Sequence, residues 1–503
     1  MSGDVRHAMP DISGRHAASS GYLGAAGTGR MAAGPFTLVV TSPSLVFTRG
    51  TGPIAIGSTA ASISYRIADE KNATVRTGTR WMSSSSSTIP IDDLEPGYYT
   101  LSMHAGAADP TDMTTSFAVI EPVPAMGAEA PYGASVHIGR AGWPLAVLED
   151  ARKAGISHIR EDAWWNRFET GKGVYTFPAS FTAEVERAQA LGLTPLFIAD
   201  GANPLYDAGR TPSSPEGIAA FGKFAAALLA RYGEDNVEVL NEYNARTFNT
   251  SACGTTPVCY LDVLKGVAAA VGPEANVVAP ATIGISNCSG CFAPTLAGLG
   301  GLDNLDAYSV HPYHYPGGPE WMAGSGDTIA GLRQTVQGKP IYLTEMGWPT
   351  DTGHGTTELQ QADNLIRLYA VTGALGVTRI YWYDLVNDGS DPANPEHNFG
   401  MMRQPVATDL VTVTANAPKP ALVAQAVTAR MIGAKPYLGN DGVALPVRSA
   451  RFGDTRVLWS TTSATITLTG DGPITVVDAY GRASTHASPY TLTLGPTPVF
   501  VRT

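Results

Sequence analysis

Between Tyr132 and about residue 430, short apolar runs alternate with stretches of helical period. The first run, GASVHIG, precedes LAVLEDARKAGI, and the pattern continues to RIYWYDLVND, so that eight strand-like runs fall within just under 300 residues. Alternating strands and helices favour a parallel sheet, and eight such units predict a closed (β/α)8 barrel. A doubly wound open sheet is the alternative, but no Gly-x-Gly-x-x-Gly motif follows the first run.

Different patterns flank the predicted barrel. Before it, runs such as FTLVV and YYTLSMHA are separated by Gly, Pro and Ser clusters, and after about Pro436 the helical period gives way to runs such as ATITLTG. Both patterns predict small β-sandwiches. The first residues are rich in Gly, Ala and Ser and lack the apolar core of a secretory signal. We therefore expect a flexible leader over 1–35, an Ig-like β-sandwich over 36–122, the catalytic barrel over 132–430 and a C-terminal β-sandwich over 431–503.

The charge balance narrows the possible partners. Lys and Arg number 33 against 44 Asp and Glu, which gives a formal net charge of −11. Nucleic acids and acidic membrane surfaces both need a basic face, and no stretch holds the roughly 18 consecutive apolar residues of a membrane span. We expect neither partner. Eight Trp and twenty Tyr suit a sugar-binding surface, although core packing accounts for most of them.

Two carboxylates stand where strands of the barrel end. VEVLNEYNA places Asn241 and Glu242 at the end of the fourth strand, and IYLTEMGWP places Glu345 at the end of the seventh. Barrel active sites lie at the C-terminal ends of the strands, and these two strands face each other across the barrel. A lone Glu is more often a surface ion-pair partner. Two facing carboxylates are what cleavage of a glycosidic bond requires, one as acid and one as nucleophile or stabilising base.

The residues that carry the carboxylates resemble the acid/base and nucleophile segments of the clan A retaining glycoside hydrolases. HIREDAWWNRFETGKGVYTF is similar to the strand-two segment of that clan, SVHPYHY to its strand-six His-x-Tyr, and YWYDL to the end of strand eight. The matched positions are Arg160, Asp162, Trp165, Glu169, His311, Tyr313 and Trp382. Within the clan the chain most resembles family 39, which includes β-xylosidases, α-L-iduronidases and bacterial exopolysaccharide endo-hydrolases; family 5 is the nearest competitor.

The resemblance implies a role for each matched residue. Glu242 would be the acid/base and Glu345 the nucleophile, kept ionised and aligned by Arg160 and Tyr313. Asn241 would donate a hydrogen bond to the sugar 2-hydroxyl. His311 would hold a sugar hydroxyl or serve the hydrogen-bond network of strand six.

The remaining candidates are substrate contacts. Trp382 would form the platform beneath the sugar, with core packing as the rival interpretation. Trp165, His137, Asp200 and Asn203 complete the expected binding residues, the last three because they end the first and third strands. No metal or organic cofactor is needed for this chemistry.

Four cysteines lie close together, Cys253 and Cys259 in CGTTPVC and Cys288 and Cys291 in CSGC. Two local disulfides, four thiolates on one metal ion and free thiols are the alternatives. We favour disulfides, which would indicate an extracytoplasmic location, secreted or periplasmic.

The function expected from the sequence is retaining hydrolysis of a polysaccharide, with a bacterial extracellular polysaccharide or its oligosaccharides as substrate. The alternatives are a family 5-like endo-glycanase, a transglycosylase on the same barrel and a non-catalytic carbohydrate-binding protein. Loss of chemistry usually begins with a catalytic carboxylate, and both are present. The sequence leaves sugar identity, endo or exo action and the oligomeric state open.

Overall fold

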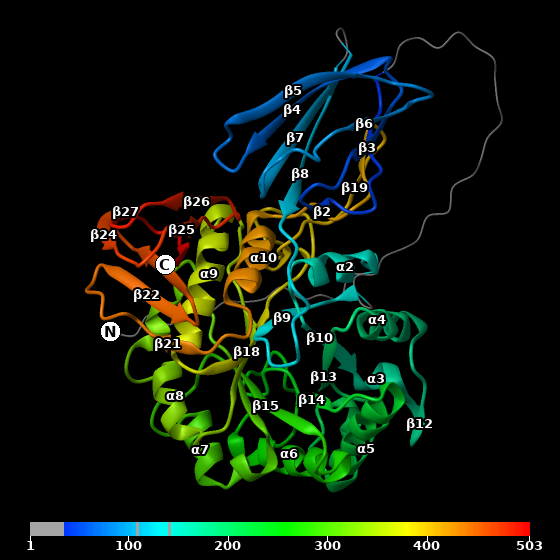
Figure 1. Cartoon of the computed structure of the whole chain (residues 1–503). Helices are drawn as coiled ribbons and strands as arrows, with labels where there is room; N and C mark the ends of the chain where they lie inside the picture. Colours follow the sequence, from blue (N-terminus) through cyan, green and yellow to red (C-terminus); the bar gives the residue numbers. More distant parts are fainter. Residues whose placement is uncertain (1–34, 107–109, 139–141) are drawn as a thin grey trace, which may run out of the picture.

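The structure is a computed structural model that describes residues 35–106, 110–138 and 142–503. The predicted leader over 1–35 lies, apart from Pro35, outside the described residues. A barrel occupies the middle of the chain, and β-rich regions precede and follow it (Figure 1). The predicted fold class, a (β/α)8 barrel flanked by an N-terminal and a C-terminal β-domain, is confirmed.

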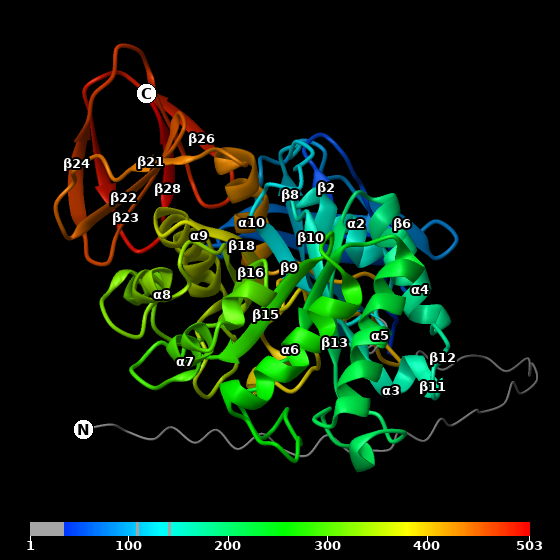
Figure 2. The same cartoon turned by 90° about the horizontal axis from the view of Figure 1, so that it is seen from below.

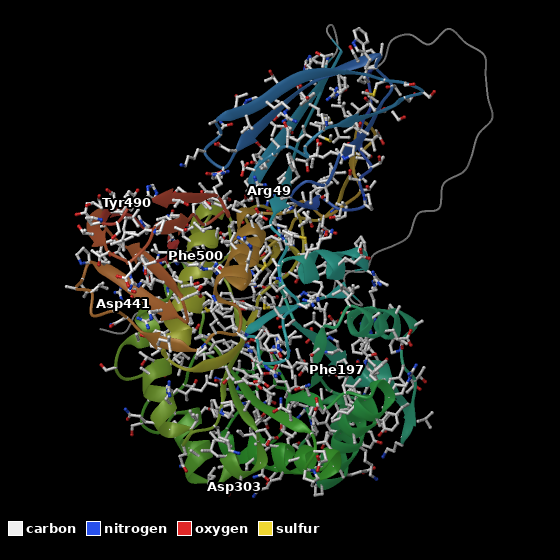
Figure 3. All side chains as sticks on the ribbon, in the orientation of Figure 1. Arg49, Phe197, Asp303, Asp441, Tyr490 and Phe500 are labelled. Atoms are coloured by element: carbon white, nitrogen blue, oxygen red, sulfur yellow. A yellow bond between two sulfur atoms is a disulfide. The ribbon has the colours of Figure 1, made fainter. Side chains whose placement is uncertain are left out.

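Eight parallel strands close the barrel, because the first strand pairs with both the second and the last. The strands are β9 (Tyr132–Ser135), β10 (His158–Trp164), β13 (Thr194–Asp200), β14 (Asn236–Val239), β15 (Asn276–Ile283), β16 (Ala307–His311), β17 (Ile341–Met346) and β18 (Val377–Trp382). Nearly all their residues are buried, as expected of strands covered on both faces. Phe197 of β13 packs on the helix layer through Phe181 and Tyr232, and Figure 3 labels it within the barrel domain.

A helix follows each barrel strand, and together the helices surround the strands (Figure 2). They are α2 (Ala146–Lys153), α4 (Ala179–Ala190), α5 (Pro215–Tyr232), α6 (Pro257–Val271), α7 (Phe292–Gly298), α8 (Ile329–Thr335), α9 (Glu358–Ala374) and α10 (Pro420–Ile432). Helix α5 shows why they form. Ser214 caps it by accepting a hydrogen bond from the Gly217 amide, and Gly233 ends it with a φ of 67°.

The N-terminal sandwich consists of two five-stranded sheets around one core. One sheet holds β2 (Val46–Thr48), β8 (Thr111–Ile120), β7 (Gly97–Ala105), β4 (Ser62–Asp69) and β5 (Thr74–Trp81). The other holds β19 (Val406–Ala407), β20 (Val411–Val413), β1 (Leu38–Val40), β3 (Ile54–Ser58) and β6 (Ser86–Ile89).

Two strands of this sandwich come from a distant part of the chain. We expected residues 406–413 within the barrel domain, but β20 pairs in parallel with β1, and Val413 lies buried in the core of the N-terminal sandwich. The reason is that this short apolar segment completes a sheet edge there. The sandwich and the barrel are therefore joined by backbone hydrogen bonds as well as by the linker.

The C-terminal β-domain has a six-stranded and a two-stranded sheet. The larger holds β21 (Tyr437–Gly439), β22 (Val447–Phe452), β23 (Thr455–Ser460), β28 (Val499–Arg502), β25 (Ile474–Val477) and β26 (Ala483–His486), and the smaller β24 (Ala464–Leu468) and β27 (Tyr490–Leu494). Trp459 of this domain donates a hydrogen bond to Glu320 of the barrel at 2.9 Å. Arg482 donates two hydrogen bonds to Glu70 of the N-terminal sandwich, at 2.7 and 2.6 Å, so all three domains are in contact.

Across the described ranges, the helices are too short or too polar to cross a lipid bilayer.

Candidate active site

Asn241 and Glu242 follow β14 at the C-terminal end of the barrel, where the backbone takes an unusual course. Leu240 and Glu242 have φ values of 60° and 46°, in the left-handed region that non-glycine residues rarely adopt. The amide of Leu240 donates to the carbonyl of Ala199 and the amide of Glu242 to that of Ala281, so both neighbouring strands hold this course. Strained backbone that its surroundings fix in this way is characteristic of functional positions.

Glu345 lies near the end of β17 and is held through both carboxylate oxygens. Arg160 donates to its Oε1 at 2.7 Å, and the Tyr313 hydroxyl donates to its Oε2 at 3.0 Å. His311 Nδ1 lies 3.6 Å from the same Oε2. The structure therefore brings Arg160 and Tyr313 to Glu345, as the sequence predicted.

Arg160, on β10, connects three acidic or amide groups. Besides Glu345, its guanidinium donates to Glu238 Oε2 at 2.6 Å and to Asn241 Oδ1 at 2.9 Å. A guanidinium only donates hydrogen bonds, so the oxygen of the Asn241 amide must be the atom that faces it. The Asn241 Nδ2 group then has no acceptor among the described residues and can donate to a ligand.

His311, the last residue of β16, lies between the two carboxylates. Its Nδ1 is 2.8 Å from Glu242 Oε1, and its Nε2 is 3.1 Å from the Thr344 hydroxyl. One oxygen of Glu242, one oxygen of Glu345 and a nitrogen of His311 all lie within 4.8 Å of one another. The ends of strands four and seven therefore meet above strand six.

The two carboxyls have opposite electrostatic environments. Burial raises the pKa of Glu242 above its ordinary value, and the charge of Glu345 adds to this effect, although His311 partly offsets it. Burial alone would also raise the pKa of Glu345, but the charges of His311 and Arg160 outweigh it, and hydrogen bonds from Arg160 and Tyr313 help to hold that pKa below its ordinary value. Glu345 is thus the more acidic of the pair.

Asp200, at the end of β13, supports the site from behind. Its Oδ1 accepts a hydrogen bond from the Asn241 amide at 3.0 Å, and its side chain is buried. Burial, with the nearby charge of Asp162, raises the pKa of Asp200 to about 7. We expected a direct sugar contact, but in this structure Asp200 positions the backbone of Asn241.

Trp165 and Asn203 were expected to contact substrate, and the structure places them in the protein interior instead. Trp165 has 0% exposed surface, stacks on Tyr206 at 5.1 Å and donates to Glu169 at 2.7 Å. Asn203 is also buried, and its amide donates to the Glu169 carbonyl. Both hold the segment that follows β10, because the Trp165 indole N–H and the Asn203 amide N–H group donate to Glu169 within it.

Trp382 is likewise not the sugar platform that the sequence predicted. It has 0% exposed surface, packs against Trp348 at 5.9 Å and donates to the Phe399 carbonyl. Successive strand residues point to opposite faces, so the next residue, Tyr383, takes the other side. Tyr383 is half-buried, and its ring lies edge-on to the rings of Tyr313 and His137.

Two neighbouring acidic residues escaped the sequence interpretation. Glu238 binds Arg160, and the signal for it was a charged residue in the middle of an apolar strand, VEV. Glu396 accepts a hydrogen bond from the Tyr383 hydroxyl at 3.2 Å. Burial and the charge of Glu345 raise the pKa of Glu396 to about 7. Glu396 lies in the polar loop LVNDGSDPANPEHN, where nothing in the sequence distinguishes it from the other polar residues.

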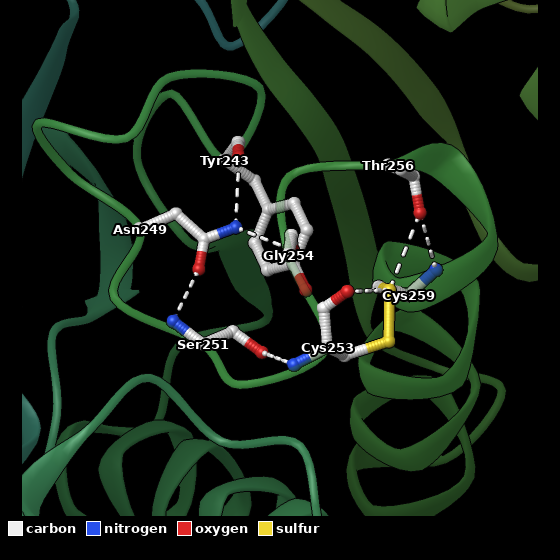
Figure 4. The surroundings of a disulfide bond; sticks show 7 residues. All are labelled: Tyr243, Asn249, Ser251, Cys253, Gly254, Thr256 and Cys259. Carbon is white, nitrogen blue, oxygen red and sulfur yellow. Dashed lines mark hydrogen bonds between the residues drawn. A yellow bond between two sulfur atoms is a disulfide. The ribbon is translucent and has the colours of Figure 1, made fainter.

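Both predicted disulfides are present, Cys253–Cys259 in the loop after β14 and Cys288–Cys291 in the loop after β15. Figure 4 shows how the first connects to the site. The Asn249 amide group donates to the carbonyls of Tyr243 and Gly254, beside the disulfide, and Tyr243 directly follows Glu242. The disulfide prediction is confirmed over its metal and free-thiol alternatives.

Known protein structures include several with a fold similar to that of this chain. No protein-family model and no curated protein sequence matches the chain. Among solved structures, a family 39 glycoside hydrolase from the gut symbiont Bacteroides cellulosilyticus WH2 is similar, with a TM-score of 0.76 at 23% identity over 92% of this chain and 99% of that one. The chain has the fold of a family 39 glycoside hydrolase.

Two further structures share the fold at lower similarity. A monomeric β-xylosidase from Caulobacter crescentus CB15 has a TM-score of 0.53 at 16% identity, over 76% of this chain and 97% of that one. A family 30 subfamily 8 xylanase from Clostridium acetobutylicum has a TM-score of 0.50 at 14% identity, over 74% of this chain and 96% of that one. The resemblance drawn from the sequence motifs is thus confirmed at the level of the fold.

Proposed function

We propose that the protein is a retaining glycoside hydrolase in which Glu345 is the nucleophile and Glu242 the acid/base. In the first step Glu242 gives its proton to the leaving glycosidic oxygen while Glu345 bonds to the anomeric carbon. In the second step Glu242 takes a proton from water, which attacks that carbon and releases Glu345. The observation that carries the proposal is the opposite electrostatic environment of the two carboxyls.

The environment of each carboxyl suits its proposed role. A general acid must begin protonated, and burial beside Glu345 raises the pKa of Glu242. A nucleophile must begin ionised, and Arg160 and Tyr313 both donate to Glu345. The sugar ester on Glu345 would carry no charge, which removes one cause of the raised pKa of Glu242. Glu242 would then give up its proton more readily and act as the base.

The spacing of the carboxylates supports retention over inversion. One oxygen of Glu242 lies within 4.8 Å of one oxygen of Glu345. Retaining enzymes hold their carboxyl groups roughly 5–5.5 Å apart, whereas inverting enzymes leave about 6.5–9.5 Å for a water molecule. A water molecule positioned for direct attack would not fit between Glu242 and Glu345 as they stand.

Sugar contacts follow from the groups that remain available. Asn241 Nδ2 would donate to the sugar 2-hydroxyl, since its oxygen faces Arg160. Tyr383 takes the place that the sequence gave to Trp382, as the aromatic side chain beside the sugar. His137 lies edge-on to Tyr383 and would contact a sugar hydroxyl through Nε2.

The proposed substrate is an oligosaccharide or polysaccharide, with a bacterial extracellular polysaccharide as the first candidate. Two disulfides support an extracytoplasmic location, because such bonds persist in oxidising compartments. Two of the similar structures are a β-xylosidase and a xylanase, so β-xylosides belong in any first substrate screen.

Anomeric analysis tests the proposal. Aryl β-xylosides, β-glucosides and β-galactosides, together with bacterial exopolysaccharides, are screened for release of phenol or reducing ends. The accepted substrate is then followed by proton NMR. We expect the first-formed sugar to keep the anomeric configuration of the substrate; an inverted first product, or no cleavage of any glycoside, would contradict the proposal.

A further inference from the structure

A second cluster of ligand-type side chains lies at the seam where the barrel closes. His137 follows β9, the first strand, and Asp384 and Asp388 follow β18, the last. His137 Nδ1 lies 2.8 Å from Asp388 Oδ1 and 4.0 Å from Asp384 Oδ2. One ligand atom from each of the three residues lies within 4.8 Å of the other two. The proposed catalytic steps do not use Asp384 or Asp388.

Asp384 is the unusual member of this cluster. It has 0% exposed surface, and neither of its carboxylate oxygens has a hydrogen-bond partner among the described residues. The charged form of a buried carboxylate without partners costs several kcal/mol, so such a group either keeps its proton or is compensated by a cation. One of these oxygens is the atom that faces His137.

The positive charge of Lys419 acts on Asp384, but Lys419 does not donate a hydrogen bond to it. Lys419 is also fully buried, but its ammonium group donates to the Thr350 hydroxyl at 3.1 Å and to the Asn398 carbonyl at 2.9 Å. No ion pair joins it to Asp384 in the described part of the chain. Among the described residues, the Asp384 oxygens therefore lie beside His137 and Asp388 and accept no hydrogen bond.

We propose that His137, Asp384 and Asp388 bind a divalent transition-metal ion, with Zn²⁺ as the representative. An imidazole nitrogen with two carboxylate oxygens is a donor set for zinc and its neighbours, whereas Ca²⁺ and Mg²⁺ prefer oxygen ligands alone. Zinc holds such ligands at about 2.0–2.2 Å, so the ligand atoms of a tetrahedral site lie roughly 3.3 Å apart. The separations of 2.8 and 4.0 Å from His137 bracket this value, and the third separation, between Asp384 and Asp388, is at most 4.8 Å.

Hydrogen bonds hold the backbone around the cluster of His137, Asp384 and Asp388 in place. The amide of Leu385 donates to the carbonyl of Ser135 at 3.0 Å, which extends the pairing of β18 with β9 past the strand ends. The amide of Met401 donates to the carbonyl of Asp384, and that of Gly400 to the side chain of Asn387. A metal ion here would join the first and last barrel strands and fix the ring of His137, beside Tyr383.

The catalytic cluster is a weaker metal candidate and serves as the control. Glu242, His311 and Glu345 also bring three ligand atoms together. Both oxygens of Glu345 already accept hydrogen bonds, from Arg160 and from Tyr313, and the positive guanidinium disfavours a second cation beside it. A metal ion would therefore bind to His137, Asp384 and Asp388 in preference to the catalytic cluster.

Titration calorimetry with Zn²⁺ tests the proposal on the full-length chain after chelator treatment and desalting. We expect one equivalent to bind, with a rise in Tm, and no comparable binding of Ca²⁺. Asp384→Asn and Asp388→Asn should each weaken binding by at least about 10- to 100-fold, while Glu345→Gln should bind like the parent. Circular dichroism verifies that each variant is folded, and Asp388, half-buried in a loop, provides the test if Asp384→Asn does not fold.

Three results would overturn the proposal. In the first, Zn²⁺ up to millimolar concentration gives no heat of binding and no rise in Tm. In the second, both Asp variants bind Zn²⁺ as the parent does, and in the third, Glu345→Gln abolishes binding. None of these results bears on glycosidase activity, since the proposed hydrolysis runs on Glu242 and Glu345.

Discussion

The ends of strands four and seven present the same side chain, a glutamate, in two different environments. Glu242 lies in a strained turn, and its carboxyl group has one hydrogen-bond partner among the described residues, His311 Nδ1 at 2.8 Å. Glu345 lies within strand β17 and accepts hydrogen bonds from both Arg160 and Tyr313. Both are largely buried, so burial alone would make both weak acids. The donors around Glu345 create the difference.

This difference shows how one barrel assigns two roles to one residue type. At the end of strand seven, Arg160 and Tyr313 add to His311 in stabilising the charged form of Glu345. At the end of strand four, His311 only partly offsets burial, so the neutral form of Glu242 is favoured. Experiments can therefore separate the two strand ends. A substitution at one end should change the role of the carboxyl group there, acid/base or nucleophile, and leave the other role unchanged.

The largest expected effect comes from Glu345→Gln, which removes the nucleophile. We expect kcat/KM on the accepted substrate to fall at least about 10⁴-fold, because an amide cannot attack the anomeric carbon as the carboxylate of Glu345 does. Steady-state rates, with the fold verified by circular dichroism, measure the loss. A variant that retains near-normal turnover would remove Glu345 from the mechanism.

Glu242→Gln should have a large effect that depends on the leaving group. We expect a loss of about 10²- to 10⁴-fold on a natural glycoside, where the leaving oxygen needs a proton. The first step should be nearly intact on a dinitrophenyl glycoside, whose leaving oxygen is already a weak base. Burst kinetics would show an initial release of phenol followed by slow turnover. Equal losses on both substrates would mean that Glu242 is not the acid.

Tyr313→Phe tests the environment of Glu345 and should have a smaller effect than removal of either carboxyl group. It removes the hydroxyl donor to Glu345, so the ionised form loses stabilisation and the pKa of Glu345 rises. The acidic limb of the pH profile of kcat/KM should then move to higher pH, by about one unit for one charge-assisted hydrogen bond. Tyr206→Phe is the matched control, because Tyr206 donates instead to Glu169, away from Glu345. A shift in the control as large as that in Tyr313→Phe would break the argument.

The smallest effect is expected from the disulfide beside Glu242. The Cys253→Ser/Cys259→Ser double variant should lower Tm by a few degrees, since the cross-link closes only a short loop. Because Asn249 connects that loop to the residue after Glu242, kcat/KM should fall less than about tenfold. The Cys288→Ser/Cys291→Ser pair is the control and should affect kcat/KM less. Equal losses of kcat/KM in the two pairs would show that the first loop has no special connection to the acid.

The sequence predicted the two catalytic residues at strand ends. It misplaced Trp382, whose role depends on which side of its strand the side chain points to. Glu242 and Glu345 were found because barrel geometry gathers strand ends in one place. Arg160, inside β10, was found through the resemblance of its segment to strand two of the clan. Successive residues of a strand point to opposite faces, so a shift of one position exchanges the cleft side for the helix side. The run YWYDL has aromatic side chains on both faces, and the sequence does not show which of them lies on the cleft side.

Long-range pairing was the other limit. Strand β20, three residues long, joins β1 across more than 370 positions of sequence, as the pair Leu38 and Val411 shows. Short apolar runs carry no signal for which distant sheet edge they complete. Glu396 was missed for a similar reason, since its place beside Tyr383 depends on how a polar loop folds back.

The pH dependence of kcat/KM in the parent and in Glu242→Gln tests the central claim most directly. The parent should give a bell, with the acidic limb set by ionisation of Glu345 and the basic limb by loss of the proton from Glu242. The raised pKa of Glu242 and the lowered pKa of Glu345 place the limbs in that order. In Glu242→Gln, on a dinitrophenyl glycoside, we expect the basic limb to vanish and the acidic limb to remain. Loss of the acidic limb with the basic limb intact would contradict the account, because it would make Glu242 the ionised partner.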